Sequence, residues 1–142
     1  MKYKNPCATA DVIVERNNEI LLVKRKHKPF RDMWALPGGF LEYGKETLEE
    51  TAVRELKEET SLQAKIENLE LFGVYSSPKR DPRGHIISHV YIAGECSGNL
   101  RADDDAKDTG FFPLDNLPEL SFDHNKILKE YKLYNQDRNR SK

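Results

Sequence analysis

Short runs of apolar and β-branched residues, separated by polar or glycine-containing stretches, recur along the chain and predict a set of strands. These runs are residues 10–14, 20–23, 34–36, 66–75, 86–93 and 110–114. The polar stretch Arg16-Asn17-Asn18-Glu19 predicts the tight turn of a β-hairpin between the first two runs, because asparagine tolerates positive φ. Proline, glycine and charge predict loops over residues 24–32 and 76–85, and Pro37-Gly38-Gly39 is expected to end the third run.

Residues 47–60 have the clearest helical pattern in the chain. Apolar residues recur every four positions along one face of this segment, at Leu48, Ala52 and Leu56, with Val53 beside them. Thr47 and Glu50 form the Thr-x-x-Glu pattern of a capping box, which predicts that the helix begins at this point. The segment is therefore predicted to be an amphipathic helix whose apolar stripe faces the core.

The C-terminal region predicts a second, shorter helix. Residues 127–134 are helical in character, Asp123 is a candidate N-cap, and the polar residues 136–142 are expected to fray. Strands and helices mix without strict alternation, which indicates an α/β or α+β sandwich around a mixed sheet. With 142 residues and no internal repeat, the chain is expected to form one domain.

Composition limits the partners that the sequence predicts. Charged residues make up 33% of the chain but the formal net charge is −1, so charge does not argue for a nucleic-acid or membrane partner. No apolar run approaches the roughly 20 residues of a membrane span, and residues 1–6 do not resemble a secretory signal. Cys7 and Cys96 are isolated, and we expect free thiols in a cytoplasmic protein, although two cysteines can pair.

Three carboxylates gather on one face of the predicted helix. Glu55 and Glu59 are four residues apart, and Glu58 flanks them. Like charges at this spacing destabilise a helix by about 0.2–0.5 kcal/mol per pair, and Mg²⁺ or Mn²⁺ would relieve that repulsion. The preceding Pro37-Gly38-Gly39 would let a backbone carbonyl approach the same cation. The alternatives are an ordinary turn and a solvated charged face, which is what most charge runs are.

The stretch that contains these residues resembles the Nudix box. It reads Gly39-Phe40-Leu41-Glu42-Tyr43-Gly44-Lys45-Glu46, then seven residues, then Arg54-Glu55-Leu56-Lys57-Glu58-Glu59-Thr60-Ser61-Leu62. The family pattern is Gly, five residues, Glu, seven residues and Arg-Glu-apolar-x-Glu-Glu-x-Gly-apolar. The approach Trp34-Ala35-Leu36-Pro37-Gly38-Gly39 is also similar to that of the family. The resemblance covers about residues 8–134 and implies a Nudix-type α/β/α sandwich around a mixed β-sheet.

Two positions depart from the family pattern. Six residues separate Gly39 from Glu46, so either the loop carries one extra residue or Lys45 stands where glutamate is expected. The pairing of Glu46 with Arg54, which the family uses to hold the box together, therefore depends on how the longer loop folds. Ser61 replaces the closing glycine, which predicts a different helix end because serine disfavours the left-handed conformation.

The resemblance implies a metal-dependent hydrolase. Glu55, Glu58 and Glu59, with the carbonyl of Gly39 or Gly38, would ligate Mg²⁺, or Mn²⁺ in its place. The substrate would be a nucleoside diphosphate linked to another group, and Glu58 or Glu59 would orient or deprotonate the attacking water. A later acid could supply this base instead. The candidates for it, each of which could equally belong to a solvated acidic loop, are Glu95, Asp103, Asp104, Asp105 and Asp108.

The loop over residues 77–85 bears on the substrate. Its Arg80 and Arg83 offer planar guanidinium groups suited to phosphate, although a charged surface loop would look the same. The run Arg-Asp-Pro-Arg-Gly-His before a strand resembles Nudix members that cleave or sense ADP-ribose, and Arg25 matches a basic position common in them. Adenine could stack on an aromatic side chain that could equally belong to the core, namely Phe30, Trp34 or Tyr75, and no catalytic role is assigned to His85 or His89.

These features together predict an ADP-ribose pyrophosphatase that yields AMP and ribose 5-phosphate from a small-molecule nucleotide substrate. One alternative is a pyrophosphohydrolase of nucleoside triphosphates or their oxidised forms. Another is a non-catalytic domain of a regulator that senses ADP-ribose. A homodimer is expected from the habits of ADP-ribose-cleaving relatives.

Overall fold

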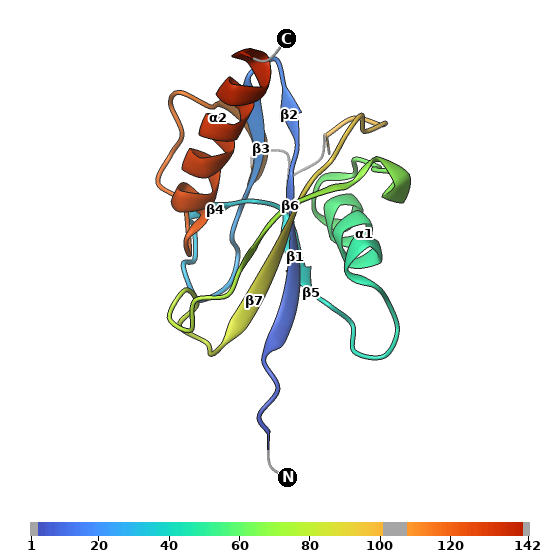
Figure 1. Cartoon of the computed structure of the whole chain (residues 1–142), viewed down its shortest axis with the longest axis vertical. Coiled ribbons are helices and arrows are strands. Elements are labelled where there is room, and N and C mark those ends of the chain that lie inside the picture. The colour runs from blue at the N-terminus through green and yellow to red at the C-terminus, as the bar shows by residue number, and fades with distance from the viewer. Residues whose placement is uncertain (1–2, 101–107, 141–142) are drawn as a thin grey trace.

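The computed structural model describes residues 3–100 and 108–140, which form two helices on opposite sides of two sheets (Figure 1). In chain order the elements are β1 (Cys7–Ile13), β2 (Glu15–Arg16), β3 (Glu19–Lys24), β4 (Trp34–Ala35), β5 (Gly38–Phe40), α1 (Leu48–Thr60), the 3₁₀ helix η1 (Ile66–Asn68), β6 (Glu70–Tyr75), β7 (Ile86–Ile92), β8 (Thr109–Pro113) and α2 (His124–Arg140). The predicted α/β sandwich is confirmed. No helix in the described part of the chain is both long and apolar enough to cross a bilayer.

The described strands form two sheets that have no strand in common. The first sheet has the order β5-β1-β7-β6, with β1 parallel to β7 and the outer strands antiparallel, so the sheet is mixed as predicted. In the second sheet β3 pairs with β2, β4 and β8. The predicted hairpin exists between β2 and β3, and its turn residues Asn17 and Asn18 have φ of 53° and 64°. The run at residues 10–14 instead pairs in the first sheet, because the chain changes sheets after Ile13.

The segment Pro37-Gly38-Gly39 does not simply end a strand. Gly38 and Gly39 belong to β5, which pairs with β1 in the first sheet, whereas β4 belongs to the second. A Cβ at Gly38 would lie 2.2 Å from Oδ1 of Asp11, so only glycine lets the two strands approach this closely. The glycines therefore place the backbone between the two sheets at the point where a pocket opens.

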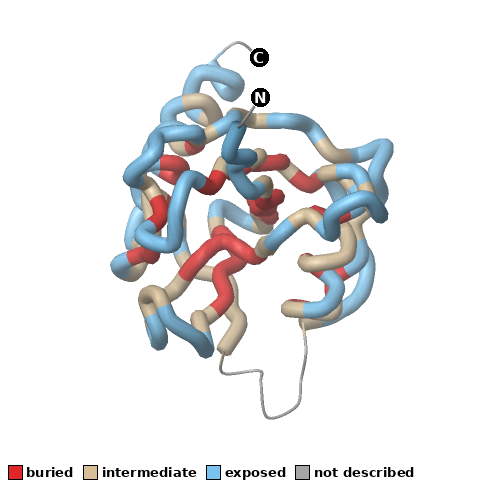
Figure 2. The backbone as a smooth tube through the Cα atoms, turned by 90° about the horizontal axis from the view of Figure 1, so that it is seen from below, coloured by how far each residue is buried: buried red, intermediate tan, exposed pale blue. Residues whose placement is uncertain are grey.

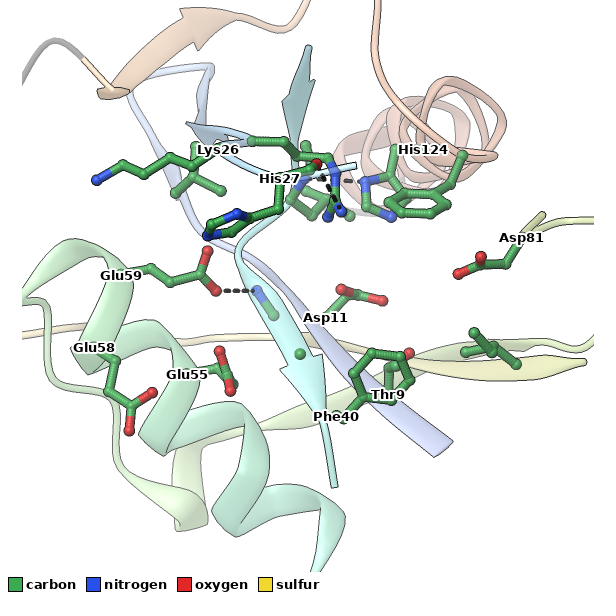
Figure 3. A pocket seen from close by; sticks show the side chains of 18 of the residues that line it. Thr9, Asp11, Lys26, His27, Phe40, Glu55, Glu58, Glu59, Asp81 and His124 are labelled. Atoms are coloured by element: carbon green, nitrogen blue, oxygen red, sulfur yellow. Dashed lines mark hydrogen bonds between the residues drawn. The ribbon is translucent and has the colours of Figure 1, made fainter. Parts of the chain in front are cut away.

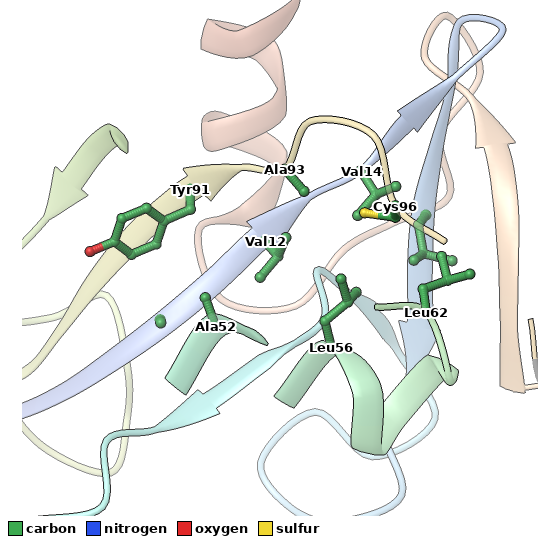
Figure 4. Packing of buried hydrophobic residues seen from close by; sticks show 10 residues of the cluster. Val12, Val14, Ala52, Leu56, Leu62, Tyr91, Ala93 and Cys96 are labelled. Carbon is green, nitrogen blue, oxygen red and sulfur yellow. The ribbon is translucent and has the colours of Figure 1, made fainter. Parts of the chain in front are cut away.

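One face of the first sheet packs against α1. The predicted stripe supplies Ala52 and Leu56, which share a buried cluster with Val12 of β1 and with Val14, just after that strand (Figure 4). Thr47 caps the helix through a complete capping box with Glu50, as predicted. The acidic edge of α1 is thereby fixed relative to β5.

The other side of the sandwich packs against α2. Ile127 and Leu128 of this helix are fully buried with Ile13, Leu22 and Val90. Buried residues therefore concentrate on the central strands, while the outer surfaces of the helices and loops are exposed (Figure 2). On this side of β1, Ile13 lies in the α2 core, whereas Thr9 and Asp11 line the pocket.

Several predicted boundaries are wrong. Residues 66–69 are not strand, since a 3₁₀ turn precedes β6. Helix α2 is 17 residues long and runs to Arg140, so residues 136–140 are helical rather than frayed. Ser61, which was expected to avoid the left-handed region, occupies it with φ of 72° and ends α1 as glycine would. Cys7 is exposed and Cys96 is buried, and both are free.

Candidate active site

One part of the site is an ion pair between Glu46, in the loop before α1, and Arg54 of α1. Arg54 donates to Glu46 through Nε (3.0 Å) and Nη2 (2.7 Å), and the Nη2 group also donates to the carbonyl of Phe40 (3.1 Å). These hydrogen bonds from Arg54 lower the pKa of Glu46 to about 2. The loop with one extra residue thus still brings Glu46 to Arg54, so the longer spacing changes the loop and not the pair.

The same arginine reaches the acidic cluster. Nη1 of Arg54 lies 2.8 Å from Glu55 and 3.3 Å from Glu58. The hydrogen bonds that Arg54 donates to Glu46 above all, and to Glu55, raise the pKa of Arg54, so it stays charged. One guanidinium therefore links the glycine strand, the loop and two of the three carboxylates that the sequence singled out.

The third carboxylate is the most buried of the three. Oε1 of Glu59 accepts a hydrogen bond from the N–H of Gly38 at 2.9 Å. Burial raises the pKa of Glu59 to about 8, and the neighbouring Glu55 and Asp11 add to the effect. Burial also raises the pKa of Glu55. The protein therefore holds two carboxyl groups where their charged forms are unfavourable without a counter-charge.

These residues fit a divalent cation. They offer hard carboxylate oxygens, the donors that Mg²⁺ and Mn²⁺ prefer. A Cβ at Gly39 would lie 2.5 Å from Cδ of Glu55, so glycine is needed for this close approach of backbone and carboxylate. No three acidic, histidine or cysteine side chains in the described residues already converge on one point, because Arg54 draws Glu55 and Glu58 to itself. Binding a cation would require these two side chains to turn from Arg54.

A pocket of about 600 Å³ opens beside the acidic cluster, between α1 and the start of α2 (Figure 3). Glu55, Glu58 and Glu59 line one wall. The opposite wall comes from β1, from the loop before β7 and from the residues just before α2. It carries Arg80, Asp81, Arg83, Phe122 and His124, while Asp11 of β1 lies against Gly38, between this wall and the acids. The pocket is large enough for a nucleotide-sized ligand with its reactive end at the acids.

The three arginines predicted to bind substrate all line this pocket, but they differ in what holds them. Arg80 is nearly buried and donates two hydrogen bonds to Asp123, at 2.9 and 2.7 Å. Asp123 thus binds Arg80, and no capping bond from its side chain to α2 is seen within the described residues. Arg25 donates through Nε to the carbonyl of Pro29, and burial lowers its pKa.

Arg83 is the most exposed of the three. Its guanidinium pairs with Asp81 at 2.8 Å and lies over the rings of Phe40 and Phe122, 4.9 and 5.4 Å from their centroids. Arg25 also lies over Phe122, at 4.8 Å. Burial would raise the pKa of Asp81, but the hydrogen bonds from Arg83 lower it overall. Arg83 and Arg25, together with the rings they lie over, therefore form a flat cationic and aromatic surface of the pocket. Arg80 instead stabilises the pocket wall through its hydrogen bonds to Asp123.

Other predicted candidates lie away from the pocket. Trp34 packs on Phe112, Tyr75 donates to Glu130, and Phe30 packs on Phe122 from behind the pocket lining. Of the later acids, Asp108 lines the pocket, whereas Glu95 lies at a second depression near the end of β7 and is excluded as the base. Asp103, Asp104 and Asp105 lie outside the described residues. His85 and His89 bond to backbone carbonyls and do not line the pocket.

The sequence did not point to several residues of the lining, among them Asp11, Phe40, Phe122 and His124. One of them left a signal, because Asp11 is a charged residue inside the otherwise apolar run 10–14. The two phenylalanines are indistinguishable from core residues in the sequence. His124 lies 88 residues along the chain from its hydrogen-bond partner Leu36, and no local sequence pattern reveals that contact.

An α/β/α sandwich with an acidic helix edge facing a glycine strand is the architecture of a phosphoanhydride hydrolase of the Nudix type. The sequence matches the NUDIX domain family over residues 5–131, and the chain belongs to this family as a Nudix hydrolase. Members of the family generally use divalent metal ions.

Individual proteins of this family show which members the chain is similar to. The chain is 57% identical over 129 residues to an ADP-ribose pyrophosphatase of Methanocaldococcus jannaschii, covering 91% of this chain and 75% of that protein. A MutT/nudix family protein of Enterococcus faecalis superposes with a TM-score of 0.78 at 34% identity, over 90% of this chain and 61% of that one. A bifunctional NMN adenylyltransferase/ADP ribose pyrophosphatase of Francisella tularensis, complexed with AMP and a Mn ion, gives 0.75 at 34%, over 91% and 42%.

Proposed function

We propose that this protein hydrolyses ADP-ribose to AMP and ribose 5-phosphate with Mg²⁺, and that Mn²⁺ can replace it. The observation that carries the proposal is the pocket itself. It joins the acidic edge of α1 to a wall of arginine and phenylalanine side chains, within a volume that fits a dinucleotide-like substrate. The identity with the archaeal ADP-ribose pyrophosphatase supports the same substrate.

The three carboxylates have different surroundings, and we assign them different tasks. Glu59 is fixed by Gly38 and Glu55 lies against Gly39, so these two, with the Gly39 carbonyl, are the principal metal ligands. A bound Mg²⁺ would neutralise charge on the diphosphate and acidify a water. The side chain of Glu58 is 58% exposed, so it can ligate from the rim and pass a proton from the attacking water to solvent. Glu58 is therefore the proposed base.

The arginines bind the substrate. Arg83 and Arg25 lie over Phe122, which leaves their guanidinium groups facing the pocket with planar donors for phosphate or ribose oxygens. Arg80 contributes to the same wall by holding Asp123, and through it the start of α2.

A substrate panel tests the proposed activity. Purified protein with Mg²⁺ is expected to hydrolyse ADP-ribose with a kcat/KM well above that for nucleoside triphosphates, including 8-oxo-dGTP. Equal rates on ADP-ribose and the triphosphates would overturn the substrate. Tight ADP-ribose binding without turnover would instead indicate a sensor.

Two variants test the assignment of tasks. Glu58→Gln is expected to lower kcat by about 10²–10⁴-fold while Mg²⁺ binding in calorimetry changes little. Glu59→Gln is expected to weaken Mg²⁺ binding as well as turnover. If the two variants affect metal affinity equally, Glu58 is not a separate base. A homodimer and a cytoplasmic location stay predictions, which light scattering and cell fractionation would test.

A further inference from the structure

The wall opposite the acidic helix contains a buried histidine that the proposed mechanism does not use. His124 is only 3% exposed, yet its ring lines the pocket. Its Nδ1 accepts a hydrogen bond from the N–H of Leu36 at 3.1 Å. A backbone N–H is always a donor, so Nδ1 carries no proton and the proton of the neutral ring sits on Nε2.

The neutral state of this ring is supported by its surroundings. Burial lowers the pKa of His124, and the guanidinium groups of Arg80 and Arg25 lower it further, against the opposing charges of Asp11 and Asp123. Within the described residues the bond from Leu36 is the one hydrogen bond that the ring makes. The Nε2–H is therefore a donor of fixed direction, available to a ligand.

An acceptor lies on the same side of the pocket. Asp11 is 8% exposed, lines the pocket and accepts a hydrogen bond from the fully buried hydroxyl of Ser88. Oδ1 of Asp11 lies so close to Gly38 that a Cβ there would come within 2.2 Å of it, so the carboxylate is held in place by packing. Figure 3 shows Asp11 and His124 on the side of the pocket away from Glu58.

An acceptor and a neutral donor that line the same pocket match one part of ADP-ribose. The edge of adenine presents an amino group that donates and a ring nitrogen that accepts. Phe122, whose ring centroid is 5.5 Å from that of His124, lies under the guanidinium groups of Arg25 and Arg83, and these planar groups are suited to stack on a flat base rather than on a sugar. Hypoxanthine has the same shape but places a carbonyl oxygen where adenine has its amino group, and this oxygen would face the Asp11 carboxylate.

We propose that Asp11 and His124 together recognise the adenine base, Asp11 by accepting from the amino group and His124 by donating from Nε2 to a ring nitrogen. This inference deepens the proposed function and rests on it. The pair selects the substrate, and the acidic cluster of α1 performs the hydrolysis. Neither Asp11 nor His124 belongs to the Nudix box.

Comparing adenine with hypoxanthine tests this directly on the unmodified protein. Inosine 5′-diphosphate ribose is expected to give a kcat/KM about 10–100-fold below that of ADP-ribose, the effect of losing a hydrogen bond to a charged group. In calorimetry AMP is expected to bind more tightly than IMP by a similar factor. Equal values for both pairs would overturn the adenine proposal, whereas hydrolysis of neither substrate would overturn the proposed function instead.

Variants of the acceptor sharpen the test. Asp11→Asn can present an amide N–H₂ to a carbonyl oxygen, so the ratio of kcat/KM for the two substrates is expected to fall towards one. Asp115→Asn, on an 82% exposed side chain paired with Lys132, is the matched control and should keep the ratio. A ratio unchanged by Asp11→Asn would remove Asp11 from base recognition.

Variants of the donor separate recognition from stability. Asn at position 124 keeps an acceptor near Nδ1 for Leu36 but cannot reach the position of Nε2, while Gln reaches that position and loses the bond to Leu36. We expect His124→Asn to be the more stable of the two but to raise KM for ADP-ribose about tenfold with kcat retained, and His124→Gln to show the reverse ranking. His85→Asn, an exposed site outside the pocket, is the control. If the less stable variant is also the one with the higher KM, the role of His124 is structural only.

Discussion

The two walls of the pocket are made in opposite ways. The acidic wall comes from one helix and the loop before it, and its hydrogen bonds join residues at most 21 positions apart, as between Gly38 and Glu59. The opposite wall is assembled from β1, the loop before β7 and the start of α2. Several of its bonds span long stretches of the chain, 77 residues between Ser88 and Asp11 and 88 between Leu36 and His124, beside local ones such as that from Arg83 to Asp81.

The two walls also differ in how completely their charges are paired. On the acidic wall one cation, Arg54, pairs with four carboxylates, so negative charge is left in excess. Burial raises the pKa of Glu59 to about 8, and the negative charges of Glu55 and Asp11 add to this effect. On the opposite wall arginines pair with Asp81 and Asp123, which nearly balances the charge. The excess negative charge suits one wall to a cation, and the balanced charge of the other fits its proposed role in recognising the rest of the substrate by shape and hydrogen bonding.

The largest expected effect lies on the acidic wall. Glu59→Gln should lower kcat by about 10³-fold or more, because it removes a metal ligand that Gly38 holds in position. Steady-state kinetics at saturating Mg²⁺ measures the change. Glu67→Gln, on an exposed residue of η1, should leave kcat unaltered. Normal turnover by Glu59→Gln would mean that the acidic wall does not carry the chemistry.

The next prediction tests whether Arg80 stabilises the opposite wall or binds substrate directly. Arg80→Ala should destabilise the protein by about 3 kcal/mol, because it leaves Asp123 without its partner in a largely buried site. Chemical denaturation measures the loss, and the exposed Arg31→Ala should have almost no effect. A stable Arg80→Ala protein with a greatly raised KM would instead show that Arg80 binds substrate directly.

A smaller effect on stability is expected from the Glu46–Arg54 ion pair of the acidic wall, and this effect depends on pH. The pKa of Glu46 is about 2 in the folded protein and higher when unfolded, so its contribution to stability is present above pH 4.5 and is lost as the pH falls towards 2. Glu46→Gln should therefore lower the Tm at pH 7 by a few degrees, and the difference from the unmodified protein should shrink in acid. A Tm difference that stays constant from pH 7 to pH 3 would argue against the ion pair as the cause.

The smallest effect is expected at the end of α1. Ser61 has φ of 72°, where a non-glycine residue costs about 1 kcal/mol. Ser61→Gly should raise the Tm by roughly 3 °C without changing kcat, since Ser61 ends the helix and contributes no group to the pocket. Ser97→Gly, at an exposed site that faces Gln63 across a β-bridge, provides the comparison and should not stabilise. A Tm that Ser61→Gly leaves unchanged or lowers would show that the serine is not strained there.

Much of the fold was predictable because local patterns decide it. The apolar stripe and capping box of α1, the Asn17-Asn18 turn and most of the strands occur where the pattern places them. The errors fall where long-range packing overrides the local signal. Residues 136–140 stay helical as part of α2, whose earlier turns are buried on the sheets, and Ser61 accepts a left-handed conformation because the chain must turn there.

The acidic wall follows from the sequence alone, since carboxylates three and four residues apart on a helix must share a face wherever that helix packs. The sequence also indicated an arginine-rich loop. Only the tertiary structure decided that Arg80 braces the wall while Arg83 and Arg25 face the pocket, and that Asp11 and His124 meet there. The physical reason is that these contacts join strands and loops dozens of residues apart, and their partners are chosen by sheet register and packing rather than by spacing along the chain.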